Sequence, residues 1–310
     1  AATIAENGDD RDKARLFYAR LEKLLSAPGA APEDAQGRAL VASKIKELRT
    51  ALPPGFFTGL GRQIVAYTGL FEFGSDSPEH LFATVVGDPR GNDINFGVAS
   101  WSFGTGTLGP LLRQFQQTDP QRFQAIFGDG IGRIEAVLAG GREDGLAFAR
   151  DILEQGHRLR EPWASRFREL GCEQKFQQVQ MRTLEPYFKR AVALADQYGL
   201  RSERGLALCF NAVFQWGTIR GKTKEALDAS MAAFVQEHRR QPGEVERLHL
   251  MTKAINENLP KRFPQLSVRY ELLAKGSGPA PGARTIDLEA SGLRLVDFRT
   301  GQPVSEIISR

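Results

Sequence analysis

Two carboxylic side chains are the first candidates for chemistry in this sequence. Glu72 ends an apolar, helix-like pattern between Phe71 and Phe73, where burial and the negative end of a helix both disfavour an ionised carboxylate. We therefore expect its pKa to be raised, as a general acid requires. Asp88 lies sixteen residues later in a polar Gly-Asp-Pro-Arg-Gly turn that keeps a carboxylate charged. Such a pair is typical of acid–base hydrolysis.

The same residues also have a plainer structural interpretation. Glu72 would then be a helix-end residue paired with Arg62 or Arg90, and Asp88 would only form a turn. Asp93 is a competing base, since it lies in the same polar stretch as Asp88.

Other chemistries have weak support in the sequence. Residues 104–109 (GTGTLG) fit the glycine pattern of a dinucleotide site, but a helical run follows where a second parallel strand should stand. We expect the glycines to turn the chain tightly from a strand into a helix. The four histidines are scattered without metal-ligand spacing, and no G-x-S-x-G motif occurs. We expect neither a metal nor a cofactor.

Helices and one small ribbon must position the carboxylates. Positions 57, 60, 64, 67 and 71 form one apolar helix face, and Gly74 is the expected C-cap. Glycine-rich alternation within 84–109 predicts a short hairpin or ribbon. Further helices are predicted at 108–115, 120–127, 145–154, 161–170, 181–198, 204–216 and 224–237. A flexible loop at 276–282 precedes β-like segments at 285–288 and 293–298.

The predicted fold class is therefore α+β, predominantly helical, with one small sheet. Residues 10–27 and 33–51 predict a helical pair within an N-terminal segment, 1–55, ahead of a main domain at 56–310. No run of 18 apolar residues occurs, so we expect no membrane insertion. A net charge of +4 favours anionic partners, but basic runs interleaved with aromatics are missing and nucleic acid is disfavoured. Cys209 is expected to be a buried thiol, and its pairing with Cys172 stays open.

The order of these motifs resembles the lysozyme-like superfamily, in particular its chitosanase branch and related peptidoglycan-active proteins. The matching stretches are 67–72 (YTGLFE), 87–91 (GDPRG), 95–108 (NFGVASWSFGTGTL) and 199–217, with a weaker match at 276–288. The resemblance implies a two-lobed fold with a small β-hairpin beside a substrate cleft. It implies Glu72 as acid and Asp88 as the base of an inverting hydrolase, with carboxyls about 6.5–9.5 Å apart.

The matching stretches also supply the candidate substrate-binding residues. Arg90 corresponds to the family's basic residue, and Trp101 is the favoured sugar-stacking aromatic ahead of Phe73, Phe103 and Trp216. The full set is Arg90, Asn95, Ser100, Trp101, Thr105 and Gln215.

The basic charge favours peptidoglycan over chitosan, which is itself a polycation. The expected reaction is cleavage of β-1,4 bonds in the cell wall by a secreted, periplasmic or envelope-delivered enzyme, with an immunity or inhibitor protein as a candidate partner. The alternatives are a chitosanase-type hydrolase and a catalytically silent cell-wall-binding module. A purely helical interaction protein would require the glycine-rich ribbon to be packed away.

Overall fold

A computed structural model describes residues 39, 43, 52–53, 55–154, 157–260 and 264–304. Apart from residues 39 and 43, the helical pair expected at 10–27 and 33–51 lies outside these described ranges. The chain divides into two compact units, which we name by their contents. The carboxylate unit comprises Gly61–Glu185 and Pro279–Thr285. The pocket unit comprises Pro186–Gly278, the chain from Ile286 onward, and the described residues up to Leu60.

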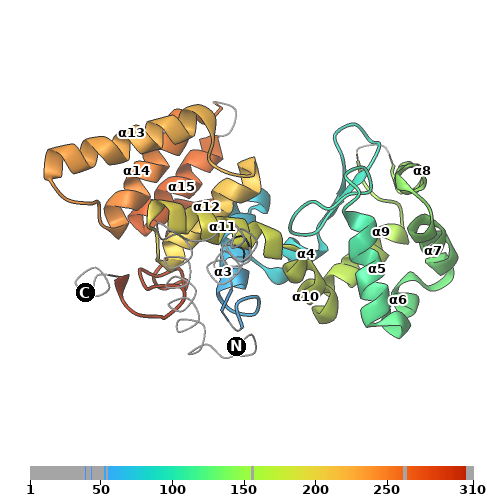
Figure 1. Ribbon diagram of the computed structural model, residues 1–310. Coiled ribbons are helices and arrows are strands. Elements are labelled where there is room, and N and C mark those ends of the chain that lie inside the picture. Colours follow the sequence, from blue (N-terminus) through green and yellow to red (C-terminus); the bar gives the residue numbers. More distant parts are fainter. Residues whose placement is uncertain are drawn as a thin grey trace. The chain divides into compact units, whose positions relative to one another are not determined.

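The carboxylate unit is built mainly from short helices (Figure 1). Most of the helix α3 (Leu60–Phe73) belongs to it, as do the strands β1 (Val85–Gly87) and β2 (Ile94–Phe96). Its other helices are α4 (Pro78–Ala83), α5 (Leu108–Thr118), α6 (Pro120–Phe127), α7 (Ile131–Ala139), α8 (Arg142–Ile152), α9 (Trp163–Cys172) and α10 (Gln174–Thr183), with a 3-10 turn at Gly128–Gly130.

Aromatic rings fill the core of the carboxylate unit. Phe96 from β2 packs on Phe167 of α9 and Phe176 of α10, with ring centroids 5.4 and 5.7 Å apart. Phe115 of α5 also contacts Phe176 at 5.2 Å. These four rings are fully buried. The contacts fix the ribbon to the helices, because displacing β2 would expose large apolar surfaces.

The ribbon is a two-stranded antiparallel sheet in which Val85 pairs with Phe96 and Gly87 with Ile94. This confirms the hairpin that the glycine-rich alternation predicts. Ile94 and Phe96 point into the core while Asn95 between them is half-buried, as the two-residue period of a strand requires.

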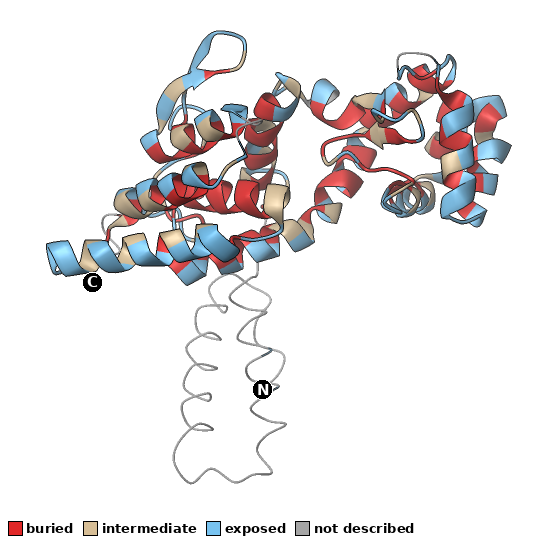
Figure 2. Ribbon diagram, turned by 90° about the horizontal axis from the view of Figure 1, so that it is seen from above, coloured by how far each residue is buried: buried red, intermediate tan, exposed pale blue. Residues whose placement is uncertain are grey.

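The pocket unit is a group of longer helices. They are α11 (Glu185–Tyr198), α12 (Glu203–Trp216), α13 (Gly221–His238), α14 (Glu244–Glu257) and α15 (Pro264–Lys275). Burial varies strongly between helices, as the red and pale blue ribbons show (Figure 2). The helix α12 buries eleven residues, whereas Leu227 is the one buried residue of α13. The strands β3 (Ser277–Ala280) and β4 (Arg284–Asp287) pair with each other as a second two-stranded sheet, and the residues of each strand are divided between the two units.

The observed class is thus predominantly helical, as expected, with two small antiparallel sheets within the described ranges where one was expected. Three details differ. The helix predicted from Phe57 begins at Leu60, since Gly55 accepts hydrogen bonds from Thr58 and Gly59 and holds a turn there. The helix predicted at 181–198 is two helices, α10 and α11. The loop predicted at 276–282 contains β3, and the segment 293–298 makes only isolated bridges.

Candidate functional site

Glu72 lies on the last turn of α3, as expected, but its side chain is exposed. Phe71 beside it turns into the core and is 8% exposed. Neighbouring positions of a helix face different directions, so burial of Phe71 leaves Glu72 on the solvent side. The expected burial of Glu72 is therefore wrong. Gly74 ends the helix with φ of 70°, which confirms the expected C-cap.

Arg62 is engaged elsewhere. Its Nη2 donates to Oε1 of Gln177 at 2.8 Å, and its guanidinium lies 5.1 Å from the ring centroid of Phe82. This arrangement anchors α3 to α10 and α4.

Asp88 occupies the turn between β1 and β2 and is half-buried. The N–H groups of Asn92 and Asp93 both donate to its Oδ1, at 2.6 and 3.0 Å. Partial burial raises the pKa of Asp88, but these hydrogen bonds, that of the Arg90 N–H and the positive charge of Arg90 outweigh it and hold the pKa below its ordinary value. Asp88 is therefore kept ionised in an accessible turn.

Asp93 has the opposite surroundings. It is 8% exposed, and its Oδ1 accepts from the N–H groups of Ile94 and Phe103 at 2.8 and 3.2 Å. Its Oδ2 accepts from the N–H of Gly104 at 2.8 Å. A Cβ on Gly104 would lie 2.6 Å from that oxygen, so the close approach requires glycine. Both oxygens are thus used to tie β2 to the glycine-rich loop.

The predicted substrate-binding residues of the ribbon have mixed surroundings. Arg90, Ser100 and Thr105 are exposed, and Asn95 is half-buried. The Thr105 hydroxyl contacts the hydroxyl oxygens of Ser102 and Thr107, at 3.0 and 2.8 Å. It therefore has partners within its own turn.

Trp101 is buried, with 4% of its surface exposed. Its backbone pairs with Phe96, and its ring lies against Gly97. The indole does not offer an open face for sugar stacking in this structure. Phe103 is equally buried, and Phe73 is half-buried.

Two residues beside the ribbon were not singled out from the sequence. Gln180, fully buried on α10, donates from Nε2 to the carbonyl of Phe82 at 2.9 Å and accepts from the N–H of Val98 at 3.4 Å. The carbonyl of His157 accepts from the N–H of Gly87 at 2.8 Å. Both come from segments far along the chain, so local spacing carries no signal of their role.

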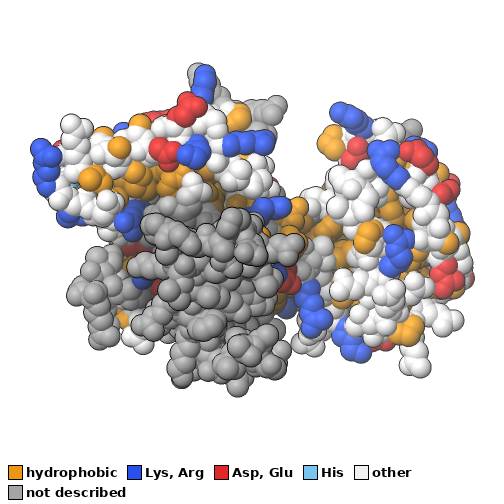
Figure 3. All heavy atoms as spheres, viewed as in Figure 1, with side chains coloured by type: hydrophobic (Ala, Val, Ile, Leu, Met, Phe, Trp, Pro, Cys, Tyr) orange, Lys and Arg blue, Asp and Glu red, His pale blue; other side chains and the backbone are white. Residues whose placement is uncertain are grey.

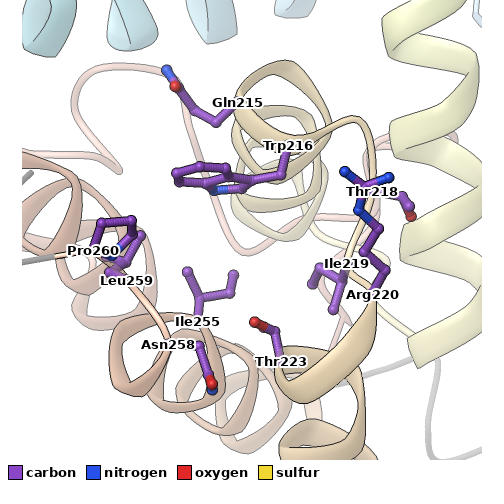
Figure 4. Close-up of a pocket in the computed structure, with 10 residues that line it drawn as sticks. All are labelled: Gln215, Trp216, Thr218, Ile219, Arg220, Thr223, Ile255, Asn258, Leu259 and Pro260. Carbon is purple, nitrogen blue, oxygen red and sulfur yellow. The ribbon is translucent and has the colours of Figure 1, made fainter.

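Gln215 belongs to the pocket unit, on the last turn of α12. It and Trp216 line a pocket of about 340 Å³ together with eight other residues (Figure 4). The others are Thr218, Ile219, Arg220, Thr223, Ile255, Asn258, Leu259 and Pro260. Arg220, Thr223 and Asn258 were not foreseen, because they come from segments that only the fold brings together.

No cluster of three or more His, Cys, Asp or Glu side chains suited to a metal occurs in the part of the chain that the structure describes. Within the same ranges, no helix has both the length and the apolar character needed to cross a membrane. Cys172 and Cys209 are not joined by a disulfide, and Cys209 is buried as expected. Burial raises the pKa of the Cys209 thiol. Figure 3 shows Lys and Arg interspersed with Asp and Glu on the face in view.

Comparison with solved structures finds chitosanases. The GH46 chitosanase of Gynuella sunshinyii in complex with chitotetraose is 19% identical with a TM-score of 0.42, over 70% of this chain and 86% of that one. The native chitosanase of Bacillus subtilis MY002 is 14% identical with a TM-score of 0.46, over 76% and 99% of the two chains. No family model and no curated protein matches the sequence.

Proposed function

We propose that the protein is a glycoside hydrolase of amino-sugar polymers, in which Glu72 is the general acid and Asp88 the general base. The observation that carries the proposal is the state of Asp88, an accessible carboxylate whose pKa is held below its ordinary value. A base must be ionised to take a proton from water.

The surroundings of Asp93 support Asp88 as the base. Both oxygens of Asp93 accept backbone hydrogen bonds in a buried site, so protonating it would weaken the loop that it holds. Glu72 supports the acid role by its exposed position on the last turn of α3.

Peptidoglycan is the proposed substrate. The net charge of +4 and pI near 9.1 favour an anionic envelope polymer over the polycation chitosan. The reaction proposed is inverting cleavage of the β-1,4 bonds of the glycan strand, in the cell envelope or outside the cell. An inhibitor or immunity protein remains a proposed partner.

The test is release of reducing ends from purified peptidoglycan, with chitosan in parallel. Glu72→Gln keeps the size of the side chain but removes its acid, and we expect release from peptidoglycan to fall by at least about 100-fold. Glu135→Gln is the matched control, since Glu135 is exposed on α7 of the same unit. We expect it to retain wild-type activity.

Other outcomes assign other functions. Equal release by wild type and Glu72→Gln would remove Glu72 from the mechanism. Release of reducing ends from chitosan alone would make chitosan, and not peptidoglycan, the substrate. Binding to peptidoglycan without release from either glycan would identify a catalytically silent cell-wall-binding module.

A further inference from the structure

The pocket bounded by α12, α13 and the end of α14 has an apolar interior. Figure 4 shows the indole of Trp216 extending between Leu259 and Pro260 on one side and Ile219 on the other, with Ile255 beneath it. Ile219 and Ile255 are buried, while Trp216 is half-buried. Its volume of about 340 Å³ lies within the range of small-ligand sites, roughly 300–1,000 Å³. One flat apolar ring face fits this interior.

Unused polar groups surround that interior. Within the described part of the chain, neither the indole N–H of Trp216 nor the hydroxyls of Thr218 and Thr223 make a hydrogen bond. The Asn258 amide donates from Nδ2 to the carbonyl of Ala254 at 2.9 Å, which leaves its oxygen as an acceptor. An aromatic face with donors and acceptors around its edge is suited to a pyranose ring, which has an apolar face and a rim of hydroxyls.

The charge of the pocket discriminates between sugars. Arg220 is exposed and has no ion-pair partner among the described residues. None of the ten described residues that line the pocket is acidic. A cationic glucosamine would therefore meet an uncompensated positive charge, whereas a sugar carboxylate would meet a guanidinium that can hold it with two hydrogen bonds.

We propose that this pocket is a binding site for a single acidic sugar, a pyranose that bears a carboxylate, which stacks on Trp216 and pairs with Arg220. The site lies within the pocket unit and its ligand contacts include neither Glu72 nor Asp88. It is therefore a binding function additional to the proposed hydrolysis and does not require it.

The test compares two probes that differ by one carboxylate. N-acetylmuramic acid carries a lactyl carboxylate that N-acetylglucosamine lacks. We expect titration with N-acetylmuramic acid to shift the tryptophan fluorescence saturably, and N-acetylglucosamine to bind more weakly. Arg220→Gln should lower the affinity for N-acetylmuramic acid by about fivefold, as expected for an accessible ion pair. It should leave the affinity for N-acetylglucosamine unchanged.

Two further variants separate the contribution of the Arg220 charge from that of stacking on Trp216. Lys222→Gln is the matched control, because Lys222 is an exposed cation two residues away that does not line the pocket. We expect no change in binding. Trp216→Ala should lower the affinity for both sugars by about tenfold, because the stacking contact is lost. Saturation-transfer NMR measures its binding, because this variant lacks the fluorescent reporter, and circular dichroism checks that it is folded.

Three results would overturn the proposal: no saturable binding of N-acetylmuramic acid, equal binding by wild type and Arg220→Gln, or equal loss in Arg220→Gln and Lys222→Gln. Glu72→Gln distinguishes this site from the hydrolytic one, since it should bind the acidic sugar as wild type does whether or not it hydrolyses peptidoglycan.

Discussion

Asp88 and Asp93 lie five positions apart in one turn, and their carboxylates have different tasks. Asp88 is accessible and accepts the N–H groups of Asn92 and Asp93 on Oδ1, whereas Asp93 is buried and accepts N–H groups on both oxygens. Partial burial alone would raise the pKa of Asp88, so it is the donated hydrogen bonds and the charge of Arg90 that keep this carboxylate charged. Residue type and spacing do not separate the two aspartates, because the donors come from the folded loop.

The pH dependence of Asp88 follows from its lowered pKa. In the unfolded chain the group titrates near 3.8, and in the folded protein it titrates below that value. Ionised Asp88 therefore stabilises the folded turn above pH 3.8, and this contribution is lost as the pH falls through the lowered pKa. We expect carboxyl NMR titration to place the Asp88 midpoint below 3.8.

If Asp88 is the base, the acidic limb of the pH–activity profile has the same midpoint as the titration of Asp88. Asp88→Asn should remove that limb together with at least about 100-fold of the activity. A midpoint at or above 3.8 would contradict the hydrogen-bonding argument.

Asp93→Asn should act on stability. One acceptor oxygen becomes an amide N–H₂ group, so at least one of the N–H groups of Ile94, Phe103 and Gly104 loses its partner. We expect the free energy of unfolding to fall by about 1–3 kcal/mol, measured by urea titration. Asp76→Asn is the control, because Asp76 is exposed and its ion pair with Arg284 at 3.7 Å is weak. A large loss of activity at unchanged stability would instead make Asp93 the base.

Among the elements, α14 shows how a local sequence signal becomes a stabilising contact. Glu246, in the first turn, accepts from the N–H of Gly243 at 2.6 Å and pairs with Arg240. The hydrogen bond from Arg240, then that from Gly243, lowers the pKa of Glu246 to about 2. The carboxylate thus satisfies one helix N–H and complements the positive end of the helix.

Glu246→Ala should lower the free energy of unfolding by about 1 kcal/mol at neutral pH. Because the folded pKa is lowered from 4.5, this difference should be fully present above pH 4.5 and shrink as the pH falls towards 2. Urea titrations at several pH values measure it. Glu257→Ala at the C-terminal end of α14 is the control, since a negative charge there does not complement the helix dipole. An equal loss in both variants would contradict the capping role.

At the scale of the whole molecule, net charge bears on the choice of polymer. An excess of four positive charges attracts an anionic polymer and repels a cationic one, and salt screens both effects. We expect adsorption to peptidoglycan in a sedimentation assay to weaken as ionic strength rises from about 0.01 to 1 M, over which the screening length falls from about 30 to 3 Å. Adsorption that is indifferent to salt would remove charge as the basis for preferring peptidoglycan.

The sequence by itself determined the helical character of the chain, the ribbon and many of its boundaries. Apolar periodicity placed α6 at its observed bounds, and glycine-rich alternation placed β2. These signals are local. A helix or strand face must be apolar at a fixed period to be buried, and a single glycine such as Gly74 indicates a C-cap in the left-handed conformation. The positions of Glu72 and Asp88 at an element end and in a turn were predictable for that reason.

Tertiary structure decided the state of each candidate. Packing on α9 and α10 turned Phe96 inward, and pairing with Phe96 left Trp101 buried. Folding of the loop brought the Gly104 N–H to Asp93 and committed that carboxylate to structure. The pocket around Trp216 needs α12, α13 and the residues after α14 together. Burial, hydrogen-bond partners and cavities depend on residues distant along the chain, so no local pattern of residue types could reveal them.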